Sequence, residues 1–242
     1  EVAANYLYSD TGNTFIRWER GFNVPDPSSI YDNPDPDTGL EAGLADLDEE
    51  TYDAFEIGMR DFVLGSYVSL TAFYQKTKDE IYKDGNSRYW TTYNLDETER
   101  KGIELSLEQY LGKLTLTEGY SYIDAEITGG QHKGNSIPDV AAHNFYISAK
   151  YEFTSKLNTI VSGTYKSDVY SNNENEGGKK NSNFVTDLVV NYNVNSDLRL
   201  YAGINNLFNE KYYSDWDYND TYSDAYGYRA ADERNYYAGA SY

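Results

Sequence analysis

The side chains best suited to ligand chemistry are aromatic rings with neighbouring arginines, gathered in two stretches of the chain. Rings beside an occasional arginine suit stacking on a planar or sugar-like ligand, and binding groups concentrate on loops. A solvated surface with an aromatic girdle at a membrane edge is the alternative interpretation. The candidate ligand-binding residues are Arg88, Tyr89, Trp90, Tyr93, Trp216, Tyr218, Tyr222, Tyr226, Tyr228 and Arg229.

One short pattern of oxygen ligands is a candidate metal site. Asp215, Asp217 and Asn219 alternate along the chain, and hard cations such as Ca²⁺ take clustered oxygen ligands. The pattern lacks the glycine and the distal glutamate of an EF-hand loop. The sequence therefore predicts no resident metal or cofactor, with Ca²⁺ in the acidic loops as the alternative.

Composition argues against several classes of catalyst and partner. Cysteine is absent, which excludes thiolate chemistry. His132 and His143 are the only histidines, too few for a histidine metal cluster. We find no catalytic constellation and expect no enzyme activity. Acidic residues outnumber basic ones 40 to 20, and a net charge of −20 repels nucleic acid.

Length and apolar patterning restrict how the chain can meet a membrane. The 242 residues suffice for one large domain, predicted to span residues 1–242. Aromatic residues make up 16% of the chain, too much ring surface for a disordered coil. No apolar run exceeds three residues, so a transmembrane helix is excluded. A membrane β-barrel remains possible, because only alternate residues of its strands need be apolar.

Hydrophobic periodicity is two nearly everywhere, as expected for strands with one apolar and one wet face. In residues 66–82, for example, Val68, Leu70, Ala72 and Tyr74 alternate with mostly polar neighbours. No stretch sustains a 3.6-residue period. Eleven strands are predicted, at residues 2–9, 13–22, 52–62, 66–82, 100–111, 113–127, 143–153, 157–170, 184–194, 198–211 and 235–242.

The predicted connections alternate between short turns and long loops. Such alternation is typical of an antiparallel up-and-down meander, and outer-membrane barrels have short turns at one end and long loops at the other. Charges of both signs on the wet face, such as Arg17, Glu56 and Glu104, suit a hydrated lumen. The pattern favours an all-β transmembrane β-barrel, with a soluble β-sandwich as the alternative.

Six segments, in order, resemble the motifs of one protein family. The most specific is residues 203–213, GINNLFNEKYY, which is similar to the family's VNNLFDKKYY. Together they resemble the carboxy-terminal part of the barrel of a TonB-dependent outer-membrane receptor of the siderophore-receptor type. The other five segments are residues 20–31, 50–60, 100–104, 120–125 and 137–143, which include RGFNVP, FEIG, RKGIE, YSYIDA and IP followed by His143.

The resemblance implies a location, an architecture and a set of partners. It implies the bacterial outer membrane, with lipid around the barrel, and a small-molecule ligand such as an iron–siderophore or other metal chelate. Family barrels have 22 strands around a plugged lumen, so eleven strands correspond to the carboxy-terminal half. The plug domain and the segment that couples to TonB are absent from these residues, so we expect this chain alone not to transport. A soluble or engineered β-sheet binding module derived from a receptor barrel is the alternative.

Two features of the charge distribution set further expectations. Glu118 shares a face with Leu116 and Tyr120, where an acidic residue on a lipid-facing surface is costly unless it lies near an interface. The long loops, at residues 23–51, 83–100, 129–142, 171–183 and 212–234, together hold 22 acidic and 8 basic residues, a net charge of −14. This field favours a neutral or cationic cargo over a strongly anionic one.

Overall fold

A computed structural model of the chain describes residues 1–27, 47–84, 91–176, 179–218 and 226–242. The side chains of residues 83–84, 91, 214–218 and 226–229 lie outside the description. Among the described residues, no helix has both the length and the apolar character that crossing a membrane requires.

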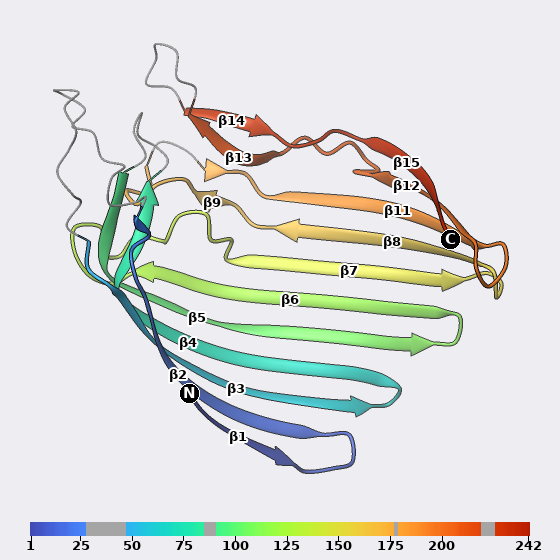
Figure 1. Cartoon of the computed structure of the whole chain (residues 1–242), viewed down its shortest axis with the longest axis horizontal. Helices are drawn as coiled ribbons and strands as arrows, with labels where there is room; N and C mark the ends of the chain where they lie inside the picture. The colour runs from blue at the N-terminus through green and yellow to red at the C-terminus, as the bar shows by residue number, and fades with distance from the viewer. Residues whose placement is uncertain (28–46, 85–90, 177–178, 219–225) are drawn as a thin grey trace.

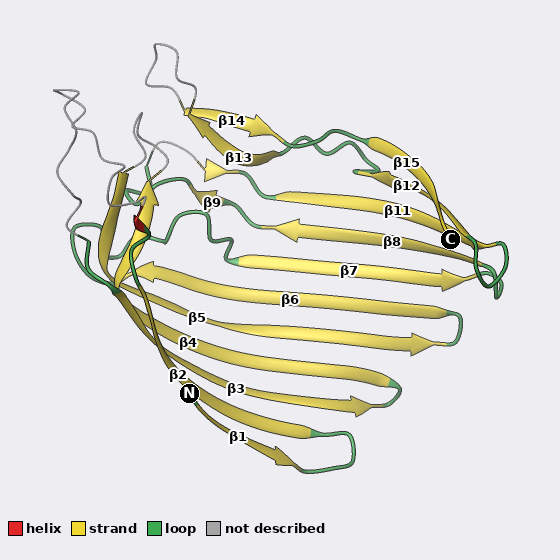
Figure 2. Ribbon diagram, in the orientation of Figure 1, coloured by secondary structure: helices red, strands yellow, loops and turns green. Residues whose placement is uncertain are grey.

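Eleven antiparallel strands form one curved sheet in which every strand pairs with its neighbour in sequence, apart from small hairpins inside two connections (Figures 1 and 2). The order is β1-β2-β3-β4-β5-β6-β7-β8-β11-β12-β15, which confirms the predicted all-β meander of eleven strands. The strands are β1 (Val2–Leu7), β2 (Asn13–Asn23), β3 (Glu50–Val63), β4 (Ser66–Asp84), β5 (Thr91–Leu111), β6 (Leu114–Ile127), β7 (His143–Glu152), β8 (Leu157–Lys166), β11 (Asn183–Asn193), β12 (Arg199–Asn205) and β15 (Asn235–Ser241).

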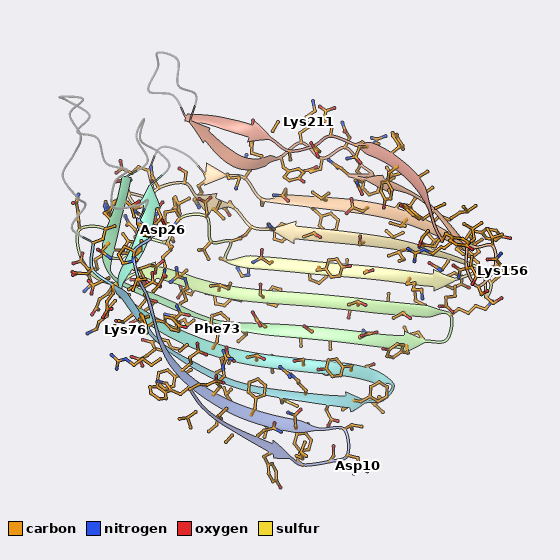
Figure 3. The ribbon with its side chains drawn as sticks, viewed as in Figure 1. Asp10, Asp26, Phe73, Lys76, Lys156 and Lys211 are labelled. Carbon is orange, nitrogen blue, oxygen red and sulfur yellow. The ribbon has the colours of Figure 1, made fainter. Side chains whose placement is uncertain are left out.

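The two ends of the sheet differ as the loop lengths predict. Short turns gather at one end, where Figure 3 labels Asp10 and Lys156, and the long connections leave from the other, where it labels Asp26 and Lys76. Two of the long connections hold small hairpins, β9 (Val169–Tyr170) with β10 (Lys179–Lys180), and β13 (Tyr213–Tyr218) with β14 (Tyr226–Ala230).

Three predicted boundaries are wrong, and all three lie at the long-connection end. The described part of the predicted loop at residues 83–100 is instead strand, because β4 reaches Asp84 and β5 begins at Thr91. The pairing continues because Leu95 packs into a small buried cluster with Ile127. The predicted strands at 157–170 and 198–211 end earlier, at Lys166 and Asn205, where the chain turns into connecting segments.

The strand register places nearly all the alternating apolar residues on one face of the sheet. Ile57 lies opposite Ala72, and Ala72 lies opposite Ile103, and the same face continues through Val161 and Leu188. This face is uncovered: Ile57 is 57% exposed, Ile103 42% and Val161 41%. A soluble sheet buries such a face, whereas a membrane-spanning sheet turns it to lipid.

Glu118 lies on this apolar face, as the sequence predicts. It pairs with Leu107 on one side and Ile147 on the other. Its carboxylate accepts a hydrogen bond from the Gln109 amide nitrogen at 2.9 Å. Both residues lie near the short-turn ends of their strands, where a charge at the membrane edge costs less than one at the centre.

The eleven-stranded sheet is open. β1 and β15 are its outermost strands, and among the described residues each pairs with only one neighbour within the sheet. An open sheet agrees with the expectation that eleven strands correspond to half of a 22-stranded barrel.

Candidate functional site

The polar face of the sheet carries cross-strand ion pairs and hydrogen bonds. Arg17 and Glu56, opposite each other on β2 and β3, form an ion pair at 3.0 Å. The Tyr52 hydroxyl donates to the Glu19 carboxylate at 2.9 Å. Paired charges of both signs on one face are typical of the water-filled interior of a barrel, as the alternation of the strands predicts.

Aromatic rings on the same face lie over glycines of the neighbouring strand. Five such pairs are directly opposite in register, and in each the ring occupies the space where a glycine Cβ would stand. The rings therefore lie along the wall instead of projecting from it, which keeps the interior open. The pairs are Phe15–Gly58, Tyr52–Gly21, Phe73–Gly102, Tyr201–Gly239 and Tyr237–Gly203.

A small apolar core holds the long-connection end of the sheet together. Leu95, Ala125, Ile127 and Ile137 are buried in one cluster, and the Tyr82 and Tyr93 rings pack against it. Those two rings meet edge to face at 5.7 Å. The core joins the tip of the β4–β5 hairpin to β6 and to the connection that follows it.

Asparagine side chains link the connections to this core. The buried Asn173 donates to the Tyr93 hydroxyl at 2.6 Å, and Asn135 donates to the Asn173 carbonyl at 2.7 Å. Asn94 holds the end of the first long connection, because its amide oxygen accepts from the Asp48 N–H at 2.9 Å. These bonds connect three segments distant in sequence into one rim.

An ion pair between β4 and β5 supports the same rim. The Arg100 guanidinium meets the Glu80 carboxylate at 2.7 and 2.8 Å, and the Thr98 hydroxyl donates to the same carboxylate. Glu80 lies beyond Lys78, where the pairing of β4 with β3 ends, at the long-connection end of the sheet. Burial on its own would raise the pKa of Glu80, but Arg100 and Thr98 outweigh it and hold that pKa below its ordinary value.

A pocket of about 710 Å³ opens on the polar face of the sheet, at the long-connection ends of β7, β8 and β11. Asn144, Lys166 and Asn183 form its row of strand residues, since Lys166 pairs with both asparagines across the sheet. Lys180 of β10 and Tyr212, which follows β12, enclose it. The volume lies within the range of small-molecule sites.

The structure describes only one side chain of the predicted ligand-binding set. Tyr93 packs against the rim core, and its hydroxyl accepts a hydrogen bond from the Asn173 side chain. The backbones of Trp216, Tyr218, Tyr226, Tyr228 and Arg229 lie in the β13–β14 hairpin, as do Asp215 and Asp217 of the candidate Ca²⁺ site, without described side chains. Arg88, Tyr89, Trp90, Tyr222 and Asn219 fall outside the described residues. Ligand binding and Ca²⁺ binding by these residues stay predictions.

Both histidines have structural partners. His143 begins β7, and its Nδ1 lies 2.9 Å from the Tyr120 hydroxyl, with the ring also against Tyr122. His132 lies 3.9 Å from the Glu174 carboxylate.

The pocket residues Lys166 and Lys180 were not singled out in the sequence. Alternation places Lys166 on the polar face together with Thr164, so the sequence pattern does indicate the face of Lys166. Lys180 reaches the pocket only because β10 folds back onto β9, which no periodicity indicates.

An open antiparallel meander with a bare apolar face and a polar opposite face defines a piece of a membrane-spanning β-barrel wall. Comparison with known proteins identifies the family to which this barrel wall belongs. The family model described as "TonB dependent receptor-like, beta-barrel" matches residues 2–207, and the chain belongs to this family of outer-membrane receptors.

Curated relatives share about a quarter of their aligned residues with the chain. The "Probable TonB-dependent siderophore receptor PiuA" of Acinetobacter baumannii is 27% identical over 251 residues, covering 88% of this chain and 32% of the relative. The "Vitamin B12 transporter BtuB" of Photobacterium profundum is 27% identical, covering 92% of this chain and 34% of the relative. The chain thus spans about a third of the length of these relatives.

Solved structures show the same fold. The crystal structure of PiuA from Acinetobacter baumannii superposes with a TM-score of 0.73 at 20% identity, covering 98% of this chain and 34% of that one. The ferric citrate transporter FecA gives a TM-score of 0.78 at 20% identity, covering 99% and 37%.

Proposed function

We propose that the receptor containing this chain imports a metal chelate, most specifically an iron–siderophore, across the outer membrane with energy delivered by TonB. Membership of the receptor family supports this proposal. Relatives described as a siderophore receptor and as a metal-pseudopaline receptor, 27% and 28% identical, favour a chelate as cargo.

The observation that carries the membrane part of the proposal is the division of the sheet into two faces. Side chains such as Ile57 and Leu70 cover the outer face and stay exposed, while Arg17 and Glu56 pair on the inner face. In a lipid bilayer the first face is solvated by acyl chains and the second by lumen water. A soluble binding module would leave the apolar face against water, at a high cost in hydrophobic free energy.

We further propose that these 242 residues supply wall and rim but not active transport. In the whole receptor, a plug domain gates the lumen and a coupling segment receives the energy from TonB. The described strands contribute polar lining and rim contacts and have no means of closing the lumen on their own.

Uptake of radioactive iron tests the receptor function. Cells lacking their own iron receptors would express the full-length receptor and receive iron as the citrate, ferrichrome or enterobactin chelate. We expect import of at least one chelate well above cells with an empty vector, and loss of that import in cells without TonB. Import of none of them, or import that persists without TonB, contradicts the proposal. Import by cells that express only these 242 residues contradicts the proposal that the residues do not perform active transport on their own.

A further inference from the structure

One asparagine fixes the start of the last long connection, which leads from β12 through the β13–β14 hairpin to β15. Asn206 follows β12 directly, is 3% exposed and has a positive φ of 53°. Figure 3 labels Lys211 in the same segment. Asparagine adopts this left-handed conformation more readily than most residues other than glycine, which has no side chain to bond with. Position 206 therefore combines a turn of the backbone with a buried amide group.

The Asn206 side chain joins the two ends of the connection. Its amide oxygen accepts a hydrogen bond from the Glu210 N–H at 2.7 Å. Its amide nitrogen donates to the Glu210 carbonyl at 2.8 Å and to the Asp232 carbonyl at 3.3 Å. The bond to Asp232 spans 26 residues of sequence, from the segment that leaves β12 to the segment that enters β15. One side chain thus closes the base of the connection.

The backbone beside Asn206 holds the connection against the sheet. The Asn206 N–H donates to the Asp187 carboxylate of β11 at 2.8 Å, and the Leu207 N–H donates to a backbone carbonyl of β11 at 2.6 Å. Further along, the Tyr212 carbonyl accepts from the Ala231 N–H of the returning segment at 2.9 Å. The connection is therefore bonded to β11 at its start and paired across its base.

These bonds determine one wall of the pocket at the long-connection ends of β7, β8 and β11. Asp187 lines the pocket from β11, and Tyr212 and Tyr213 line it from the connection. Burial, followed by the charges of Asp187 and Asp232, raises the pKa of the Tyr212 hydroxyl, so both carboxylates lie near that ring. Asn206 bonds to the same two aspartates. Its contacts therefore fix the surroundings of the Tyr212 ring.

We propose that Asn206 is the positioning residue of this pocket: its hydrogen bonds hold the Tyr212–Tyr213 wall against β11, so that the pocket is already formed when a cargo arrives. The inference rests on the receptor function proposed above and concerns how the recognition site of that receptor keeps its shape. A site that is in place for only a fraction of the time binds with an affinity reduced by that fraction. Loss of the Asn206 side chain should therefore weaken cargo binding without slowing the passage of bound cargo.

Glycine substitutions at two asparagines separate this role from a general loss of stability. Asn206→Gly keeps the left-handed backbone and removes the side-chain bonds. Asn209→Gly is the matched control, because Asn209 has a φ of 57° and its side chain accepts from the Arg234 N–H at 2.8 Å, nearer β15. Asn206→Asp is a second variant, in which an oxygen can still accept from the Glu210 N–H but nothing donates to the Asp232 carbonyl.

Amide hydrogen exchange of the purified full-length receptor tests the positioning without any cargo. The Ala231 N–H, which bonds to the Tyr212 carbonyl, reports whether the two ends of the connection stay paired. We expect Asn206→Gly to accelerate its exchange about tenfold, which corresponds to a loss of about 1.4 kcal/mol of net hydrogen bonding. Asn206→Asp should accelerate it as well, so the test stands if the glycine variant does not assemble. Unchanged exchange in the Asn206 variants, or equal acceleration in Asn209→Gly, overturns the inference.

Import of radioactive chelates measures the consequence for cargo. Cells carrying the full-length receptor or one of the variants would receive ferric citrate, ferrichrome or ferric enterobactin over a range of concentrations. For each chelate that the wild type imports, Asn206→Gly should raise the half-saturating concentration about tenfold, as for a wall in place about a tenth of the time. The maximal rate per folded receptor, counted from the heat-modifiable band, should stay unchanged. Asn209→Gly should change neither quantity.

The two measurements separate this inference from the proposed function. If the wild type imports a chelate, a lower maximal rate at an unchanged half-saturating concentration in Asn206→Gly means that the receptor function holds and the positioning role is wrong. The same shift in Asn209→Gly leads to the same conclusion. If the wild type imports none of the chelates, the proposed function is wrong, and the exchange of the Ala231 amide alone decides the inference.

Discussion

At the scale of single residues, the Arg100–Glu80 pair stabilises the tip of the β4–β5 hairpin. Their side chains are 25% and 13% exposed, so removing the arginine leaves a carboxylate with little access to water. We expect Arg100→Met to weaken the hairpin tip by about 2 kcal/mol, less than a fully buried pair would cost. Amide hydrogen exchange in residues 78–84 and 92–98 of the full-length receptor should then accelerate roughly 30-fold. Lys101→Met is the control, since its pair with Asp124 is far more exposed and should cost little.

The same pair makes the hairpin tip sensitive to acid. The pKa of Glu80 is depressed in the folded state, so its stabilisation is fully present above the ordinary value of 4.5 and is lost as the pH falls through the lower folded value. Exchange at the tip, corrected for its intrinsic pH dependence, should therefore rise below about pH 4.5 in the wild type. A tip that stays equally protected in Arg100→Met, or whose protection is independent of pH, contradicts this account.

At the scale of elements, the ring-over-glycine pairs give a prediction with an internal control. A Cβ at Gly102 would meet the backbone oxygen of Tyr122 and the ring of Phe73, whereas a Cβ at Gly119 would meet only the Tyr146 Cβ at 3.9 Å. Both glycines lie on the polar face of adjacent strands. We expect Gly102→Ala to destabilise the barrel by about 1–3 kcal/mol through overpacking, and Gly119→Ala to be neutral. Thermal unfolding of the full-length receptor, followed as the loss of its heat-modifiable band, measures both, and equal behaviour of the two variants refutes the packing argument.

The elements also show what the sequence could and could not reveal. Alternation along the strands was sufficient to predict the eleven strands, their order and the face of Glu118, because one buried or lipid-facing side fixes the register. The rim depends on contacts between distant segments, such as Asn173 with Tyr93 and Glu80 with Arg100, which have no local signature. Hence the hairpin tip at residues 83–100 was mistaken for a loop, and the pocket formed by Lys166 and Lys180 was not foreseen.

At the scale of the whole molecule, charge is distributed to favour one kind of cargo. The five long-loop segments predicted from the sequence hold −14 of the total charge of −20. Such a field attracts cations and repels anions over about a Debye length, roughly 10 Å at 0.1 M salt.

A salt titration of the full-length receptor tests this charge preference. We expect the cationic chelate ferrioxamine B to bind more tightly at low salt than at high salt, because screening weakens the attraction of the acidic rim. The polyanionic ferric enterobactin should show the opposite dependence, since salt relieves its repulsion. Lys156→Met, at the short-turn end of the sheet (Figure 3), is the control for a change of one unit of charge far from the rim and should shift neither curve. Tight binding of the polyanionic chelate that strengthens as salt is lowered contradicts a charge preference set by the acidic connections.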